Sequence, residues 1–83
     1  MVEKRIRMYG TNWCPDTARA KQVCKRKNVE FVWFDIDVDP EACAYVQSVN
    51  EGQKRVPTIV FPDGKILVEP SDSELEACLS QSK

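Results

Sequence analysis

Strand-like and helix-like segments alternate along most of the chain, and this order restricts the possible folds strongly. "RIRMY" at residues 5–9 alternates polar and apolar side chains, as a short strand does. "VEFVWFDID" at residues 29–37 is rich in branched and aromatic residues, which is typical of a strand covered on both faces. "VPTIVF" and "KILVE" flank "PDG" at residues 62–64, a pattern that predicts an antiparallel hairpin.

Helical patterns lie between these strands. Pro15 suits the first turn of a helix that continues to about Lys27, because its missing N–H would be unpaired there anyway. Asn28 is a suitable terminator for that helix. Asp39 can cap a second helix, which we expect over residues 40–50 from its apolar side chains at helical spacing.

A third helix is predicted over residues 71–79, because Ser71 and Glu74 have the spacing of a capping box. The order is therefore β-α-β-α-β-β-α. The first two strands, joined through a helix, should be parallel with a right-handed crossover, and the last two antiparallel. These connections predict an α/β fold, with one mixed four-stranded sheet and three helices, in a single domain over residues 1–83.

Charge and composition exclude several classes of protein. Twelve basic and thirteen acidic residues give a net charge of −1, which argues against a nucleic-acid or anionic-membrane binder. No apolar run approaches the roughly 20 residues of a membrane span, and no signal-peptide pattern is present, so we expect a cytoplasmic protein. The chain has no histidine, and its four cysteines lie 10, 19 and 35 residues apart, so we expect no metal site.

Cys14 is the candidate nucleophile. It stands in "TNWCPDT", between the first predicted strand and the first predicted helix. The free N–H groups and partial positive charge of a helix N-terminus favour a thiolate there, and the thiolate is the form that attacks disulfides. Thr17, one turn further on, could donate its hydroxyl to the sulfur, whereas a solvated Asp16 should oppose ionisation only weakly. The alternative is that Cys14 is an ordinary structural cysteine.

Four short motifs together resemble the glutaredoxins of the thioredoxin-fold superfamily. They are "WCPDT" at a strand-to-helix junction, "VPT" at residues 56–58, "PDG" and "PSD". The resemblance covers residues 5–79 and is closest to the short bacterial glutaredoxin-like proteins related to mycoredoxin. It implies a thioredoxin fold and a thiol–disulfide oxidoreductase with Cys14 as its nucleophile.

The resemblance also implies a groove for a low-molecular-weight thiol. Pro57 would be a cis-proline that turns the backbone of Val56 towards the sulfur of Cys14; the alternative is a trans proline in an edge strand. Ser71 and Asp72 match the loop that holds the γ-glutamyl end of glutathione, or the equivalent part of another small thiol. Alternatively, these two residues only cap the third helix.

Further groove residues are less specific. Lys21 and Arg55 are candidates for a second carboxylate of the thiol, although such residues are usually solvated surface. Trp13 and Pro15 flank the nucleophile and are predicted to contact substrate, with a packing role for Trp13 as the alternative.

Thr17 stands where dithiol glutaredoxins carry a second cysteine, so the resemblance implies a monothiol mechanism. In it, Cys14 takes the glutathionyl group from a protein, and free thiol then reduces the adduct; an engineered replacement at residue 17 would have the same consequence. Cys24 lies about 15 Å further along the helix, beyond the roughly 7 Å Cα separation of a disulfide. Cys24, Cys43 and Cys78 are therefore predicted to be structural.

Two other functions remain open. Monothiol glutaredoxins of the "CGFS" type carry an iron–sulfur cluster between two subunits with glutathione, but the Pro15–Asp16 pair departs from that pattern. A redox-inert binding module is the third possibility. For the oxidoreductase we expect no tightly bound cofactor, a small thiol as co-substrate, disulfide-bearing or thiolated proteins as partners, and a monomer.

Overall fold

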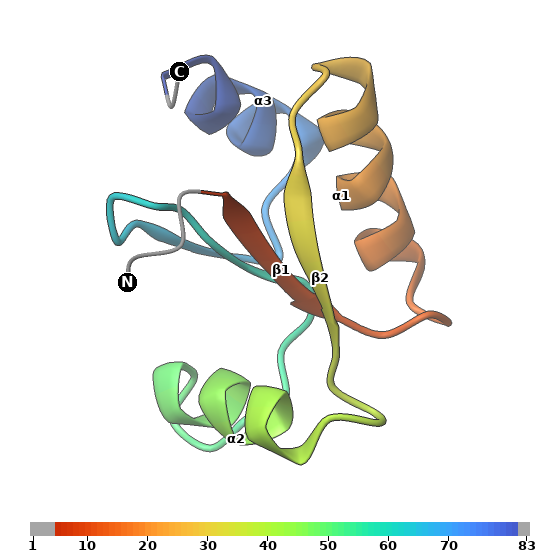
Figure 1. Cartoon of the computed structure of the whole chain (residues 1–83), viewed down its shortest axis with the longest axis vertical. Helices are drawn as coiled ribbons and strands as arrows, with labels where there is room; N and C mark the ends of the chain where they lie inside the picture. Colours follow the sequence, from red (N-terminus) through yellow and green to blue (C-terminus); the bar gives the residue numbers. More distant parts are fainter. Residues whose placement is uncertain (1–4, 82–83) are drawn as a thin grey trace.

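The computed structural model describes residues 5–81 and contains four strands and three helices within them (Figure 1). In chain order they are β1 (Ile6–Gly10), α1 (Pro15–Arg26), β2 (Phe31–Asp35), α2 (Pro40–Val49), β3 (Thr58–Val60), β4 (Ile66–Val68) and α3 (Asp72–Gln81). This is the predicted order of elements. None of the helices in this part of the chain is both long and apolar enough to cross a membrane.

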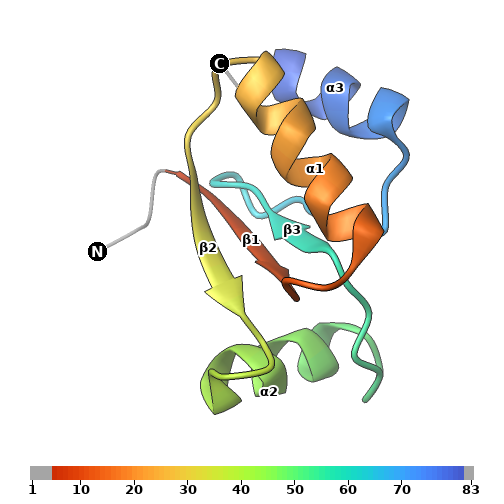
Figure 2. The same cartoon turned by 90° about the vertical axis from the view of Figure 1, so that its right-hand side faces the viewer.

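The strands form one mixed sheet in the order β2-β1-β3-β4. β1 and β2 are parallel, whereas β3 is antiparallel to both β1 and β4, so the predicted strand directions are confirmed. Helices α1 and α3 cover one face of the sheet and α2 covers the other, as the two perpendicular views show (Figures 1 and 2). The predicted α/β architecture is therefore correct.

Alternate side chains of β1 supply two separate cores, because successive residues of a strand point to opposite faces. Met8 is fully buried under α1 and α3, and its neighbour Tyr9 is buried under α2. The larger core comprises Ile6, Met8, Ala20, Val23, Cys24, Ile59, Phe61, Leu75 and Leu79. The smaller core comprises Tyr9, Ile36, Ala42, Val46 and Val60. The sheet is thus anchored on both faces.

The strand predicted over residues 29–37 is shorter than expected and lies at an edge of the sheet. Its side chains do meet both cores, since Trp33 packs against the larger one and Phe34 against the smaller. All five of its residues stay half-buried because no further strand covers the outer side. The strands of the predicted hairpin are also shorter, and β3 begins only after Pro57, which has no N–H for the ladder.

The predicted helix caps are present. One carboxylate oxygen of Asp39 accepts hydrogen bonds from the N–H groups of Glu41 and Ala42, at 3.1 and 3.2 Å. The N–H of Glu74 donates to the Ser71 hydroxyl at 3.2 Å, and the N–H of Ser71 donates to the Glu74 carboxylate at 2.9 Å. This reciprocal pair is the capping box, and it fixes where α3 begins.

Candidate active site

Three loops meet at one end of the sheet. Tyr9, near the end of β1, lies opposite Thr58, the first residue of β3. Thr58 also lies opposite Val68, the last residue of β4. The loop before α1, the Val56–Pro57 peptide and the loop before α3 are therefore neighbours, and Figure 2 shows β1 leading into α1 at this end.

Cys14 occupies the N-cap position of α1, as predicted. Its backbone is extended, with φ −82° and ψ 120°, and its carbonyl accepts the N–H of Ala18 at 3.1 Å. The side chain is half-buried and makes no capping hydrogen bond, and Pro15 follows it as an exposed residue. Cys14 therefore lies at the positive end of the helix dipole as a partly exposed residue.

The Thr17 hydroxyl makes no hydrogen bond to the sulfur, which corrects the prediction that it could donate to Cys14. Thr17 is 1% exposed, and its hydroxyl has no hydrogen-bond partner. The side chain packs against β1 instead: a Cβ added to Gly10 would lie 2.7 Å from both Thr17 Oγ1 and Cγ2. The absence of a side chain at Gly10 allows α1 to approach the strand this closely.

The peptide bond between Val56 and Pro57 is cis, as predicted. Pro57 is buried, and its carbonyl accepts the N–H of Glu69 at 2.9 Å, which ties this turn to the end of β4. Among the turn and loop hydrogen bonds of residues 5–81, none uses the N–H or C=O of Val56. Both backbone groups of Val56 are therefore available to an extended ligand.

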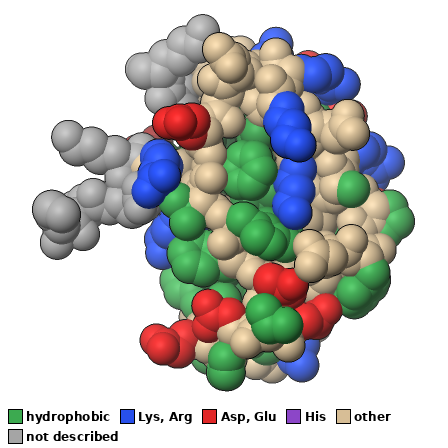
Figure 3. All heavy atoms as spheres, turned by 45° about the vertical axis from the view of Figure 1, so that its right-hand side comes forward, with side chains coloured by type: hydrophobic (Ala, Val, Ile, Leu, Met, Phe, Trp, Pro, Cys, Tyr) green, Lys and Arg blue, Asp and Glu red, His purple; other side chains and the backbone are tan. Residues whose placement is uncertain are grey.

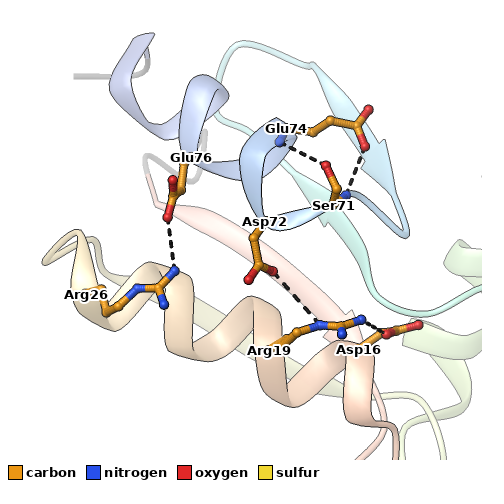
Figure 4. A network of polar contacts seen from close by, with 7 residues as sticks. All are labelled: Asp16, Arg19, Arg26, Ser71, Asp72, Glu74 and Glu76. Atoms are coloured by element: carbon orange, nitrogen blue, oxygen red, sulfur yellow. Dashed lines mark hydrogen bonds and ion pairs between the residues drawn. The ribbon is translucent and has the colours of Figure 1, made fainter.

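Asp72 faces α1, where Arg19 lies within 4.0 Å of its carboxylate (Figure 4). Arg19 also pairs with Asp16, so the guanidinium lies between two carboxylates. A surface pocket of about 300 Å³ lies in this region, lined by Pro15, Ala18, Arg19, Gln22, Arg26 and Asp72. The first turn of α1 and the first turn of α3 thus border the same pocket.

Lys21 and Arg55, the two candidates for a second carboxylate of the thiol, contact different parts of the sheet. The Lys21 ammonium lies 3.5 Å from the centre of the Trp33 ring, against the edge strand β2. Arg55 precedes β3 and reaches Glu69, beyond the end of β4, at 3.5 Å. Arg55 directly precedes the Val56–Pro57 peptide in the chain.

Comparison with known proteins agrees with this geometry. The family model for glutaredoxin matches residues 6–67, which is most of the chain. The chain belongs to the glutaredoxin family. A Mycobacterium tuberculosis protein described as a glutaredoxin is 34% identical over 79 residues, covering 95% of this chain and 94% of the relative. Mycoredoxin 1 of Corynebacterium glutamicum is 34% identical over 73 residues, covering 87% and 89% respectively.

The fold of this glutaredoxin is the thioredoxin fold, as the resemblance implied. The crystal structure of an Archaeoglobus fulgidus glutaredoxin superimposes with a TM-score of 0.73 at 28% identity, covering 95% of this chain and 87% of that one. The predicted class of enzyme is correct as well: the protein is a thiol–disulfide oxidoreductase.

The other three cysteines of this glutaredoxin lie on helices, and none of the four cysteines is in a disulfide. Cys24 is fully buried in the larger core, and burial raises the pKa of its thiol from 9.0 to about 11. Cys43 and Cys78 are half-buried, and the Cys43 thiol donates to the Gln47 side chain at 3.7 Å. Within residues 5–81, no group of three or more His, Cys, Asp or Glu side chains could hold a metal ion.

Trp13 of this glutaredoxin is 72% exposed, so its ring is not packed into a core. Its indole N–H donates to Asp37 at 2.8 Å, and the neighbouring Asn12 donates to Asp35 at 3.1 Å. Sequence reasoning missed these contacts, because no local pattern indicates which side chains from another loop will face the tryptophan. It also missed Arg19, although its position three residues after Asp16 was a usable signal.

Proposed function

We propose that this glutaredoxin reduces mixed disulfides between proteins and a low-molecular-weight thiol by a monothiol mechanism. The observation that carries the proposal is that Cys14 stands alone at the start of α1, with the buried Thr17 in place of a second thiol. The role we assign to Thr17 is packing: its contact with Gly10 positions the first turn of α1, which follows the nucleophile.

The reaction needs two thiol–disulfide exchanges. The Cys14 thiolate attacks the small-thiol sulfur of the mixed disulfide, the S–S bond breaks, and the substrate cysteine leaves as a thiolate that takes up a proton. A second small-thiol molecule, as its thiolate, attacks the small-thiol sulfur of the adduct and releases Cys14. The products are one reduced protein thiol and one oxidised dimer of the small thiol.

The loops around Cys14 supply the groups that would hold the small thiol. Its peptide backbone can pair with the free N–H and C=O of Val56 beside Pro57. A carboxylate can bind the N–H groups at the start of α3, next to Ser71. Its ammonium can pair with Asp72, which then shares its carboxylate between the ligand and Arg19.

Three exposed residues complete the proposed thiol site. Arg55 would contribute its guanidinium, which must exchange Glu69 for a ligand carboxylate. Pro15 and Trp13 would border the sulfur on the side of the helix start. The co-substrate is a glutathione-type thiol, the substrates are disulfide-bearing or thiolated proteins, and the enzyme acts as a monomer. None of the four cysteines is in a disulfide, which suits a reducing compartment, so the location we propose is the cytoplasm.

Site-directed variants test the nucleophile. Cys14→Ser should abolish reduction of a mixed disulfide between glutathione and 2-mercaptoethanol, measured by coupled turnover with free thiol. Cys43→Ser and Cys78→Ser should leave turnover nearly unchanged, because these thiols are on α2 and α3. The reverse pattern would refute the assignment. Mass spectrometry of the oxidised protein incubated with glutathione, mycothiol or bacillithiol would then identify the co-substrate from the adduct on Cys14.

The same purified proteins distinguish an oxidoreductase from an iron–sulfur cluster carrier. An iron–sulfur carrier would purify as a coloured dimer with glutathione-dependent visible absorption bands that are lost in Cys14→Ser. The proposed enzyme should be a colourless monomer that turns over mixed disulfides. Thr17→Cys should add a second route, in which oxidation consumes two free thiols through an intramolecular disulfide with Cys14.

A further inference from the structure

Two large hydrophobic side chains are exposed on loops beside the nucleophile. Trp13 precedes Cys14 and is 72% exposed, and Val38, between β2 and α2, is 77% exposed. Single exposed hydrophobic residues are common, but these two are linked through Asp37, which precedes Val38 and accepts the Trp13 indole N–H. Both therefore belong to one surface next to Cys14.

Side-chain hydrogen bonds hold this surface together. Asn12 donates to one carboxylate oxygen of Asp35 at 3.1 Å, and the other oxygen accepts the N–H of Asp37 at 2.9 Å. The loop that carries the nucleophile is thus tied at two successive residues, Asn12 and Trp13, to the loop after β2. A partner would meet a preformed surface, which lowers the entropy cost of binding.

The surface is acidic. Asp35, Asp37 and Asp39 accept hydrogen bonds only from neutral donors, and no ion pair within residues 5–81 uses them. No cationic side chain offsets these three carboxylates in a salt bridge, unlike Asp16 and Asp72, which pair with an arginine. Figure 3 shows acidic side chains around hydrophobic ones in the lower part of this face, with Lys and Arg side chains mainly above them.

We propose that Trp13, Val38, Asp35, Asp37 and Asp39 form a docking surface for polypeptide substrates whose disulfide lies beside lysine or arginine residues. The inference rests on the proposed function, since it assigns a protein partner to the Cys14 site. Basic side chains can pair with the carboxylates, while their aliphatic stems cover the valine and their charges face the indole ring.

The proposed contact suits a transient redox encounter. Such interfaces are small, and complementary charge raises the rate of association more than the affinity. A second copy of the chain is a poor occupant, because a two-fold contact through this surface would bring the same carboxylates face to face.

Single-turnover kinetics with two peptides test the docking surface. Each peptide carries one cysteine in a mixed disulfide with 2-mercaptoethanol, flanked by lysines in one and by glutamates in the other. The Cys14 thiolate attacks either sulfur, the S–S bond breaks, and the other sulfur leaves as a thiolate. Mass spectrometry follows consumption of the peptide disulfide, with Cys14→Ser as background. We expect the lysine peptide to react about tenfold faster at low salt, and the difference to shrink as salt screens the charges.

Two variants test the charge and the apolar contact of the docking surface separately. Asp37→Asn keeps an oxygen that can accept the Trp13 indole N–H, so it should remove only the charge and lower the lysine-to-glutamate rate ratio about two- to threefold. Val38→Ser should slow the lysine peptide. Matched controls lie in the β3–β4 hairpin, whose turn is at the opposite end of the sheet from Cys14. Asp63→Asn and Ile66→Ser should leave both peptide rates unchanged.

A small neutral disulfide separates failure of the docking surface from failure of the enzyme assignment. Bis(2-hydroxyethyl) disulfide should react with Cys14 at the same rate in wild type, Asp37→Asn and Val38→Ser. If it does, and the two peptides nevertheless react equally fast, the docking surface is wrong and the oxidoreductase stands. If it shows no reaction that depends on Cys14, the proposed function itself fails. A change of elution volume in Val38→Ser would indicate contact between copies, which also overturns the proposal.

Discussion

Alanine at Gly10 should destabilise the protein, because the helix that carries the nucleophile leaves no room for a side chain there. The added Cβ would lie 2.7 Å from two atoms of Thr17 and 3.2 Å from Trp33 Cη2. Thr17 is buried and branched at Cβ, so a rotation that moves its methyl away brings its hydroxyl towards the same space. Gly10 does not have a positive φ, so backbone strain is not the cause.

The magnitude follows from overpacking. Inserting a carbon into a closely packed core costs about 1–3 kcal/mol. Alanine in a strand loses less backbone entropy on folding than glycine does, which offsets roughly 0.5–1 kcal/mol, so the net decrease in the free energy of unfolding should be up to about 2.5 kcal/mol. Because the shift moves the start of α1, the rate of disulfide reduction through Cys14 should fall too.

Urea unfolding followed by circular dichroism measures the effect, and a double-mutant cycle assigns it. Thr17→Ala removes both atoms that the new Cβ would meet, so Gly10→Ala should cost little in that background, with a coupling energy of about 1–2 kcal/mol. Val23→Ala, almost two turns further along α1, should add to Gly10→Ala without coupling. Simple additivity with Thr17→Ala would refute the contact as the cause.

Three other predictions concern stability and pH. Burial raises the pKa of the Cys24 thiol from 9.0 to about 11, so the unfolded chain loses this proton at lower pH than the folded protein. The Cys24 thiol should therefore lower the free energy of unfolding by about 2 kcal/mol from pH 9 to 11, a contribution that Cys24→Ala removes and Cys43→Ala keeps in urea titrations. Ser71→Ala should cost about 1 kcal/mol in thermal unfolding through loss of the α3 cap. Hydrogen bonds from Ser71 lower the pKa of the Glu74 carboxyl below 4.5, so its stabilisation is present above that pH and lost as pH falls through the lower folded-state value. Wild type and Glu74→Gln should thus converge in stability in acid, and a constant difference would contradict this.

Much of the fold was predictable because its signals are local. Apolar spacing, strand-rich composition or a turn motif marked most of the elements. Asp39 and the Ser71–Glu74 pair marked the starts of two helices, and each forms hydrogen bonds only with residues two or three positions away. Asn28 ends the first helix as predicted, with a positive φ of 60° that asparagine tolerates better than most residues.

The candidate site was only partly predictable. The position of Cys14 depends on the adjoining strand and helix, so sequence sufficed. The cis state of Pro57 followed from resemblance to a family, since a trans proline fitted the local pattern equally well. The groups that face these two residues could not be assigned from spacing, because they come from other loops.

The sequence by itself determined the order of the elements, the caps, and the placement of one thiol where a helix begins. Only the tertiary structure decided that Thr17 turns to Gly10, that Lys21 rests on Trp33, and that Asp37 holds Trp13. The physical reason is how far apart along the chain the interacting residues lie. Helices, turns and caps are set by neighbours within about one turn of chain, whereas a side chain's partner across the molecule depends on which elements pack together.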